Sequence, residues 1–282
     1  MNDAAERTFW KMNGSGNDFV FFDARDVPPG PLGEPEAIRR ICARRTGVGA
    51  DGVVFLERYA EGDFRMRYHN ADGTRASMCG NAALCSSRLA IELGAVDPSG
   101  FRFATDAGVV TGRLRDGLPE IDLGAVRSIR LDVGIDLGAG ESRMGFADAG
   151  VPHAVILCSD ADAIKIDDRG KSVRWNAAFP DGANVDFVSR GADGWRMRTF
   201  ERGVEGETLA CGTGAVATAA VLEAWAGGRG GTTRILTSSG LPLEVRLEPE
   251  GAGWRPSLRG NAEVVFRGII RVGDEMAAVR AR

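Results

Sequence analysis

The 282-residue chain has the length of two domains and the composition of a globular protein, with 44% hydrophobic and 26% charged residues. Its formal net charge of -4 excludes the basic surface that binding to nucleic acid or to an anionic membrane requires. No run approaches the roughly 20 apolar residues that span a bilayer, and the charged residues 1–7 lack an apolar signal-peptide core. These features predict a cytoplasmic protein without a membrane or nucleic-acid partner.

The first half of the chain alternates short strand patterns with two helical patterns. We expect strands at residues 8–12, 18–24, 53–56, 64–70, 101–105, 109–114 and 120–123. The helices are expected at 34–45 and 82–93. A turn at Leu118-Pro119 ends this half. We therefore place a first domain at 8–118, with a boundary that is a turn and not a tether.

The second half repeats this alternation with one central helix. We expect strands at residues 145–149, 154–158, 184–189, 195–200, 233–237, 241–247, 254–259 and 262–271. The helix is expected at 215–226, where the glycine-rich run 227–231 stops it. The segment 160–174 has an acidic composition typical of a surface segment.

The cysteines form neither a disulfide framework nor a zinc motif. They are Cys42, Cys79, Cys85, Cys158 and Cys211, an odd count at irregular spacing without Cys-x-x-Cys. The only histidines are His69 and His153, which argues against a zinc site. Pyridoxal phosphate needs a lysine Schiff base, but Lys165 and Lys171 lie in the acidic segment. The sequence therefore predicts no metal and no cofactor.

Two of these cysteines occupy matching positions before the central helices. Met78-Cys79-Gly80-Asn81 aligns with Ala210-Cys211-Gly212-Thr213, and each follows a polar turn and precedes an apolar helical run. A weaker echo joins 16–21 to 182–187. Such self-similarity indicates two halves of one design. At a helix start, unpaired N–H groups and the helix dipole favour an anion, which lowers a thiol's pKa. The alternative is a buried free cysteine beside a glycine-rich turn.

Thiols at two equivalent helix starts suit proton transfer on the two faces of one carbon atom without a cofactor. A base removes the proton from one face while an acid delivers one to the other, and the two exchange roles in the reverse direction. Cysteine fits both roles because its pKa lies within reach of neutrality. An apparent pKa would belong to the coupled pair. Two helix N-termini would supply N–H donors for an anionic group of the substrate.

Motifs between residues 8 and 270 resemble those of the diaminopimelate epimerase family, which interconverts LL- and meso-diaminopimelate without pyridoxal phosphate. The motifs, in family order, lie at 11–19, 47–52, 70–74, 78–81, 150–153 and 201–214. The resemblance implies an α+β fold of two pseudo-symmetric domains. Each is a curved, mostly antiparallel sheet or barrel around a central helix, and the active site lies in the cleft between them. It joins a last strand, 264–276, to the N-terminal domain 8–118 and leaves 119–263 as the C-terminal domain.

The resemblance also implies roles for single residues. It makes Cys79 and Cys211 the catalytic thiols and places His153 and Glu201 near the reacting centre. It pairs Arg202 with the distal carboxylate of the substrate, for which a guanidinium fork is well suited. The other positions implied for contact with the substrate are Asn17, Asn70, Asn184 and Glu201, and, for the α-carboxylate, Gly80, Asn81, Gly212 and Thr213. It further implies lysine and cell-wall precursor biosynthesis and a homodimer.

The same residues also have ordinary structural explanations. A loop asparagine commonly forms turns, Glu201-Arg202 fits a solvated charge pair, and His153 fits a hydrogen-bonded structural residue.

The sequence departs from the family pattern at three places. The usual Gly-Asn-Pro-His is Gly150-Val151-Pro152-His153, the run after Asn81 is Ala82-Ala83-Leu84-Cys85, and the loop before Cys211 has one additional residue at about Glu205. Because Val151 replaces a substrate-contacting asparagine, a racemase of another amino acid such as histidine remains an alternative. A phenazine-biosynthesis-type isomerase lacks the paired cysteines. A two-cysteine redox protein and a non-catalytic amino-acid-binding module also remain open.

Overall fold

The computed structural model describes residues 5–272, which form two compact units. Unit 1 contains the chain up to Ile121 together with the residues from Asn261 onward, and unit 2 is Asp122–Gly260. None of the helices between residues 5 and 272 has the length and apolar character that crossing a bilayer requires.

Unit 1 is a mostly antiparallel sheet with two α-helices and one short 3-10 helix in its described part. The parallel pairs are β2–β3 and β4–β6, whereas β1–β2, β3–β4, β6–β7 and β1–β18 are antiparallel. Its elements are β1 (Ala5–Gly14), β2 (Asn17–Ala24), η1 (Gly30–Gly33), α1 (Pro35–Cys42), β3 (Gly52–Glu57), β4 (Phe64–Asn70), β5 (Arg75–Ala76), α2 (Gly80–Glu92), β6 (Phe101–Thr105), β7 (Gly108–Arg115), β8 (Leu118–Asp122) and β18 (Ala262–Val272).

Unit 2 has the same kinds of strand pairing. The parallel pairs are β11–β12 and β13–β15, whereas β10–β11, β12–β13, β15–β16 and β16–β17 are antiparallel. Its elements are β9 (Ile129–Arg130), β10 (Glu141–Asp148), β11 (Pro152–Cys158), α3 (Ile166–Arg174), β12 (Asn184–Gly191), β13 (Gly194–Glu201), β14 (Gly206–Thr208), α4 (Gly212–Ala226), β15 (Gly231–Leu236), β16 (Pro242–Glu250) and β17 (Gly253–Gly260).

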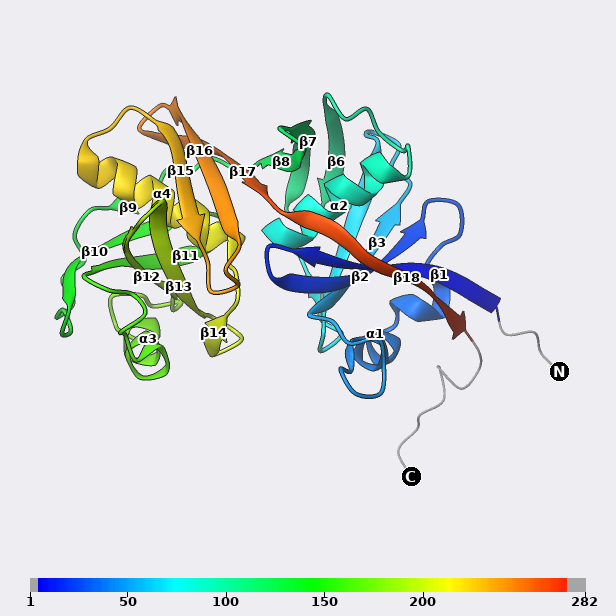
Figure 1. The fold of residues 1–282 in the computed structure, drawn as a ribbon, viewed down its shortest axis with the longest axis horizontal. Coiled ribbons are helices and arrows are strands. Elements are labelled where there is room, and N and C mark those ends of the chain that lie inside the picture. The colour runs from blue at the N-terminus through cyan, green and yellow to red at the C-terminus, as the bar shows by residue number, and fades with distance from the viewer. Residues whose placement is uncertain (1–4, 273–282) are drawn as a thin grey trace. The chain divides into compact units, whose positions relative to one another are not determined.

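The two units repeat one topology. In each, a helix joins the first parallel pair, α1 between β2 and β3 and α3 between β11 and β12. The central helices, α2 and α4, connect the second parallel pair. This confirms the predicted α+β fold of two similar, mostly antiparallel units, each with a central helix (Figure 1). The weaker sequence echo was wrong, because it joined β2 to β12, whereas the counterpart of β2 is β11.

The central helices are buried on almost every side. Residues 80–87 of α2 are all buried, and α4 is buried at residues 214–221. The strands that α4 contacts include β10, β11, β12, β16 and β17. The buried positions are therefore spread around most of the circumference of each helix instead of forming one stripe. As predicted, α4 ends at glycine, because its C-cap Gly227 adopts a left-handed φ of 63°.

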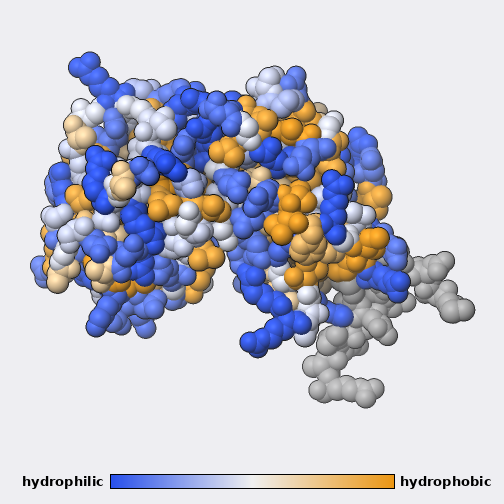
Figure 2. Space-filling model, viewed as in Figure 1, coloured by the Kyte–Doolittle hydropathy of each residue, from blue (hydrophilic) through white to orange (hydrophobic). Residues whose placement is uncertain are grey.

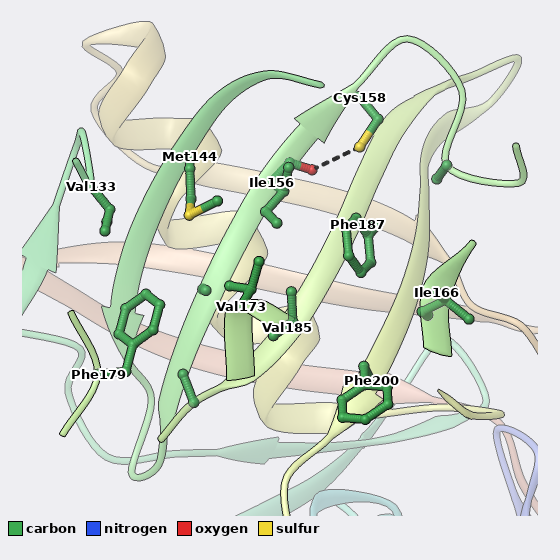
Figure 3. Close-up of a cluster of buried hydrophobic side chains, with 13 residues drawn as sticks. Val133, Met144, Ile156, Cys158, Ile166, Val173, Phe179, Val185, Phe187 and Phe200 are labelled. Atoms are coloured by element: carbon green, nitrogen blue, oxygen red, sulfur yellow. Dashed lines mark hydrogen bonds between the residues drawn. The ribbon is translucent and has the colours of Figure 1, made fainter. Parts of the chain in front are cut away.

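The other face of the unit 2 sheet carries a separate core under α3. Ile166 and Val173 of α3 pack with side chains that include Ile156, Phe187 and Phe200 of the strands (Figure 3). The acidic composition of 160–174 predicted a surface segment, and that prediction was wrong because the segment contains this helix. Its mid-helix Gly170 and its charges hide the apolar spacing, yet a Cβ on Gly170 would lie 2.5 Å from the Cβ of Phe200. Glycine thus permits the close approach of α3 to β13.

The boundary between the units lies on a strand and not at the predicted turn. Leu118-Pro119 opens β8, in which Pro119, Glu120 and Ile121 are buried. The turn is the preceding Asp116-Gly117, with φ values of 50° and 76°. An Asp-Gly pair between strands is a two-residue hairpin signal. Of the last strand expected at 264–276, residues 273–276 lie outside the described residues, and β18 pairs antiparallel with β1.

Candidate active site

Both repeated cysteines are the N-cap residues of the central helices. Cys79 precedes α2 with φ −144° and ψ 120°, and Cys211 precedes α4 with φ −128° and ψ 110°. In each case the cysteine carbonyl accepts the first intrahelical hydrogen bond, from Ala83 N at 2.9 Å and from Ala215 N at 3.0 Å. The predicted placement of a thiol at each helix start is therefore confirmed.

The Cys211 thiol is buried, and this reverses the expected direction of its pKa shift. The residue is 8% exposed. Burial raises its pKa well above the ordinary value, and the charges of Glu201 and Asp186 add to the rise, against hydrogen-bond contacts with Thr213 and Gly214 that lower it. Gly214 N lies 3.4 Å from the sulfur. Desolvation therefore outweighs the helix N-terminus, and Cys211 is a protonated thiol in this state.

Cys79 lies in a different environment. Its side chain is half-buried, whereas Cys85, on the second turn of α2, is fully buried. Burial raises the pKa of the Cys85 thiol well above its ordinary value, and the neighbouring Cys79 adds to that rise. Cys85 is therefore an inert core thiol, and Cys79 is the accessible one of the two.

A buried polar relay connects Cys211 to Asp186. Nδ1 of His153 lies 2.8 Å from Oδ2 of Asp186, and Nε2 lies 3.0 Å from Oγ1 of Thr213. Because a carboxylate only accepts, we assign the ring proton to Nδ1, so Nε2 accepts from the Thr213 hydroxyl. The Thr213 oxygen is 3.5 Å from the Cys211 sulfur. The order of contacts is thus Cys211, Thr213, His153 and Asp186.

Sequence reasoning missed Asp186 and its partner Thr199. Asp186 is fully buried, and its Oδ1 accepts from the Thr199 hydroxyl at 2.7 Å. The sequence carried one signal, an aspartate inside the apolar run Val185, Phe187 and Val188. A buried carboxylate is costly unless it is paired and hydrogen-bonded. Asp186 is therefore a member of the site that pattern reading alone passes over.

The second-half residues that the sequence singled out lie together around this relay. Oδ1 of Asn184 accepts from the backbone N of Arg202 at 2.8 Å, and its Nδ2 donates to the Pro152 carbonyl at 3.2 Å. The same Nδ2 lies 3.4 Å from Nε2 of His153. The Arg202 guanidinium donates to the Asp181 carbonyl at 3.1 Å. Residue 151, an Asn in the family pattern, is a half-buried Val without a polar group.

In unit 1, Asn17 and Asn81 form one hydrogen-bonded pair. Asn81 Nδ2 donates to Asn17 Oδ1 at 2.6 Å, and Asn17 Nδ2 donates to Asp51 Oδ2 at 3.2 Å. Asp51 in turn pairs with Arg44 at 2.6 Å. Since Asp51 accepts from Asn17, both amide orientations are fixed. Within residues 5–272, the buried Oδ1 of Asn81 has no hydrogen-bond partner, so it is an acceptor in need of a donor.

The Asp18 carboxylate of unit 1 accepts hydrogen bonds from two cations. Burial would raise the pKa of Asp18, but hydrogen bonds from Arg44 and Lys11 lower it to about 2.

Asn70 closes its own turn, because its Nδ2 donates to Thr74 Oγ1 at 3.1 Å and its backbone N to the Thr74 carbonyl at 2.9 Å. Asn70 thus has the turn-forming contacts that the structural explanation anticipates.

Comparisons with known proteins give a consistent family. The family model described as Diaminopimelate epimerase matches residues 9–128 and 145–265. Diaminopimelate epimerase of Gemmatimonas aurantiaca is 53% identical over 274 residues, which cover 93% of this chain and 99% of that protein. The Archaeoglobus fulgidus protein of the same name is 35% identical over 279 residues, with coverages of 94% and 97%.

Solved structures with low sequence identity share the fold. A phenazine biosynthesis protein of the PhzF family from Bacillus anthracis aligns with a TM-score of 0.72 at 13% identity, over 94% of this chain and 99% of that chain. A probable proline racemase from Agrobacterium radiobacter aligns with a TM-score of 0.67 at 19% identity, over 95% and 93%. At these identities the likeness shows the fold alone.

Proposed function

The chain belongs to the diaminopimelate epimerase family, and we propose that it interconverts LL- and meso-diaminopimelate with Cys79 and Cys211 as its two acid–base groups. It is an isomerase of the amino-acid epimerase class. The observation that supports the two roles best is the pair of N-cap thiols on equivalent helices, one half-buried and one buried with a raised pKa. The buried Cys211 thus holds its proton, while the half-buried Cys79 is the accessible thiol.

The proton transfers follow from this difference. In one direction the Cys79 thiolate removes the α-proton, and the Cys211 thiol delivers its proton to the opposite face of the carbanion. The enzyme is left with a Cys79 thiol and a Cys211 thiolate, the state that starts the reverse reaction. The hydrogen bond from the Gly214 backbone N–H lowers the pKa of Cys211 and so stabilises that thiolate. We assign His153 to hold the Thr213 hydroxyl, and Glu201 to the reacting centre beside Cys211.

The helix N-termini supply donors for the α-carboxylate, which takes up charge in the carbanion. At α4, Ala215 N donates to the Cys211 carbonyl and Gly214 N to the Cys211 sulfur. The backbone N–H groups of Gly212 and Thr213 lie before Gly214 in the first turn of α4, where N–H groups have no intrahelical acceptor. We therefore assign them to the α-carboxylate. By the repeat, Gly80 and Asn81 have the same role at α2.

The distal end of the substrate needs a cation for its second carboxylate. We assign this contact to Arg202, whose backbone and guanidinium are both held by neighbouring groups, and substrate contacts to Asn17, Asn70 and Asn184. Val151 contributes no hydrogen bond at this end, which keeps a racemase of another amino acid, such as histidine, as the second candidate. No cofactor has a role in this mechanism.

The deciding experiment is α-proton–deuterium exchange over a panel of amino acids without added cofactor. We expect diaminopimelate to exchange far faster than histidine, lysine or glutamate. Faster exchange with histidine would favour the second candidate. Peroxide turnover without any exchange would favour a redox protein.

We further propose a cytoplasmic homodimer that acts in lysine and cell-wall precursor biosynthesis. Exposed apolar side chains on β18 support self-association, namely Val265 at 57%, Phe266 at 47% and Ile269 at 63% exposure. Figure 2 shows hydrophobic residues gathered on this face of unit 1. Sedimentation equilibrium of the wild type and of Phe266→Ser tests this. A monomeric wild type would contradict it.

A further inference from the structure

A buried cation, Arg174, lies beneath the loop that carries Arg202. Arg174 is the last residue of α3 and is 6% exposed. Its Nε donates to Oε1 of Glu205 at 3.2 Å, and its guanidinium lies 4.1 Å from the ring centroid of Trp175. Its Nη1 is buried and has no hydrogen-bond partner in the described part of the chain. Since burial of a guanidinium is costly without a counter-charge, Glu205 is the group that compensates it.

Glu205 holds the loop in an unusual conformation. Its φ of 57° is left-handed, which a glutamate rarely adopts without support from other contacts. Its backbone N donates to the Glu201 carbonyl at 2.8 Å, and its carboxylate accepts from Gly203 N at 3.1 Å. Glu205 thus connects to Glu201 at the start of the loop 201–205, to Gly203 at its tip and to Arg174 of α3. It is also the position at which the sequence showed one additional residue.

Arg174 also contacts the second segment that holds Arg202. A Cβ on Gly182 would lie 1.4 Å from Nη1 of Arg174, so the guanidinium packs directly on the Gly182 backbone. The neighbouring Asp181 carbonyl accepts from the Arg202 guanidinium, and Asn184 accepts from the Arg202 backbone. Arg174 therefore connects the loop of Arg202 with the turn that receives its side chain.

We propose that Arg174 and Glu205 are positioning residues for substrate specificity, because their ion pair fixes Arg202 where it meets the distal carboxylate. The inference rests on the proposed function, in which Arg202 is the partner of that carboxylate. Neither residue belongs to the proton-transfer relay. Loosening the loop would add an ordering cost to substrate binding and leave the proton transfers intact. The expected effect is thus on KM and not on kcat.

The test compares Glu205→Gln and Arg174→Lys with a matched control, Glu248→Gln. Glutamine at 205 keeps an acceptor for Gly203 N but removes the charge. Glu248 is an exposed carboxylate of the same unit, ion-paired with Arg246. For a partly exposed ion pair we expect the KM for LL-diaminopimelate to rise about fivefold in Glu205→Gln, with kcat within about twofold of wild type. Arg174→Lys should shift KM in the same direction, and the control should shift neither constant.

Three outcomes would overturn the proposal. They are an unchanged KM in both variants, a loss in kcat without a change in KM, and an equal rise of KM in Glu248→Gln. Because Arg174 is buried, its variant could fail to fold, but Glu205 lies on an exposed loop and its variant keeps the experiment decisive.

Hydrogen–deuterium exchange separates this proposal from the proposed function. Amides of residues 201–208 should exchange faster in Glu205→Gln than in wild type or Glu248→Gln, without any substrate present. Unchanged protection there refutes the positioning role. A wild-type enzyme that fails to epimerise diaminopimelate refutes the function instead and leaves the exchange result standing.

Discussion

Units 1 and 2 repeat each other in strand pairing but surround their cysteines with different side chains. His153 pairs with Asn184 in the parallel register of unit 2, as Phe19 pairs with Gly52 in unit 1. Two residues further along, Asp186 of β12 pairs with Thr199 of β13, whereas the equivalent Val54 of β3 pairs with Tyr68 of β4. The positions of the buried carboxylate and imidazole of unit 2 are thus apolar in unit 1.

This difference teaches that a repeated motif and its environment control separate properties. The Cys-Gly motif sets the position of each thiol at a helix start. The neighbours set its protonation, since Cys211 is buried with Asp186 and Glu201 nearby, while Cys79 is half-buried. A reaction that needs one acid and one base at the same time benefits from one thiol that is buried and protonated and one that is accessible.

The largest effect should come from removing either thiol. We expect Cys79→Ser and Cys211→Ser each to lose about a thousandfold in epimerisation, because a serine hydroxyl is a poor base at neutral pH. The surviving thiol can still exchange the α-proton of one stereoisomer, so the two variants should show opposite stereochemical preferences. NMR-detected deuterium incorporation measures this, with Cys158→Ser as the control for a thiol outside the site. The same preference in both variants would contradict the two-base assignment.

The second prediction concerns Asp186, the buried carboxylate of unit 2 that has no counterpart in unit 1. Asp186→Asn should lower kcat about a hundredfold, because an amide can donate to Nδ1 and reverse the ring tautomer that receives the Thr213 proton. KM should change little, since Asp186 lies behind the relay. Steady-state kinetics in both directions measures the effect, with Asp162→Asn, an exposed carboxylate paired with Arg196, as the control. A larger change in KM than in kcat would assign Asp186 to substrate binding.

Thiol reactivity tests the difference in protonation directly. A raised pKa means that Cys211 stays a thiol as the pH rises past the ordinary cysteine value, and becomes a thiolate only at higher pH. Because Cys211 is buried with a raised pKa and Cys79 is half-buried, iodoacetamide at pH 8 should modify Cys79 about tenfold faster than Cys211. Mass spectrometry of peptides over pH 7–10 measures both rates. Equal rates at pH 8 would remove the proposed distinction between acid and base.

Local patterns predicted most strands and both N-cap cysteines, because alternation and glycine breaks are local signals. Asp186 could not be predicted in the same way, since β-pairing alone brings it to His153 and Thr199. The pKa of Cys211 depends on burial by the whole of unit 2. Helix α3 was hidden by Gly170, which is explained only by its contact with Phe200. The Asp116-Gly117 turn, in contrast, carries a local hairpin signal and could have been predicted from the sequence.

The smallest effect should come from the carboxylate that supports the unit 1 site. The Asp51 side chain is 37% exposed and its partner Arg44 is 60% exposed, whereas Asp186 is fully buried. Asparagine at 51 can turn its carbonyl toward Asn17, so the hydrogen bond survives and the ion pair is lost. Because exposed ion pairs contribute about 1 kcal/mol or less, Asp51→Asn should raise KM only about twofold to threefold. Kinetics beside Asp26→Asn, an exposed carboxylate paired with Arg58, checks this. A loss as large as that of Asp186→Asn would mean that the two units support their thiols equally, against the asymmetry proposed above.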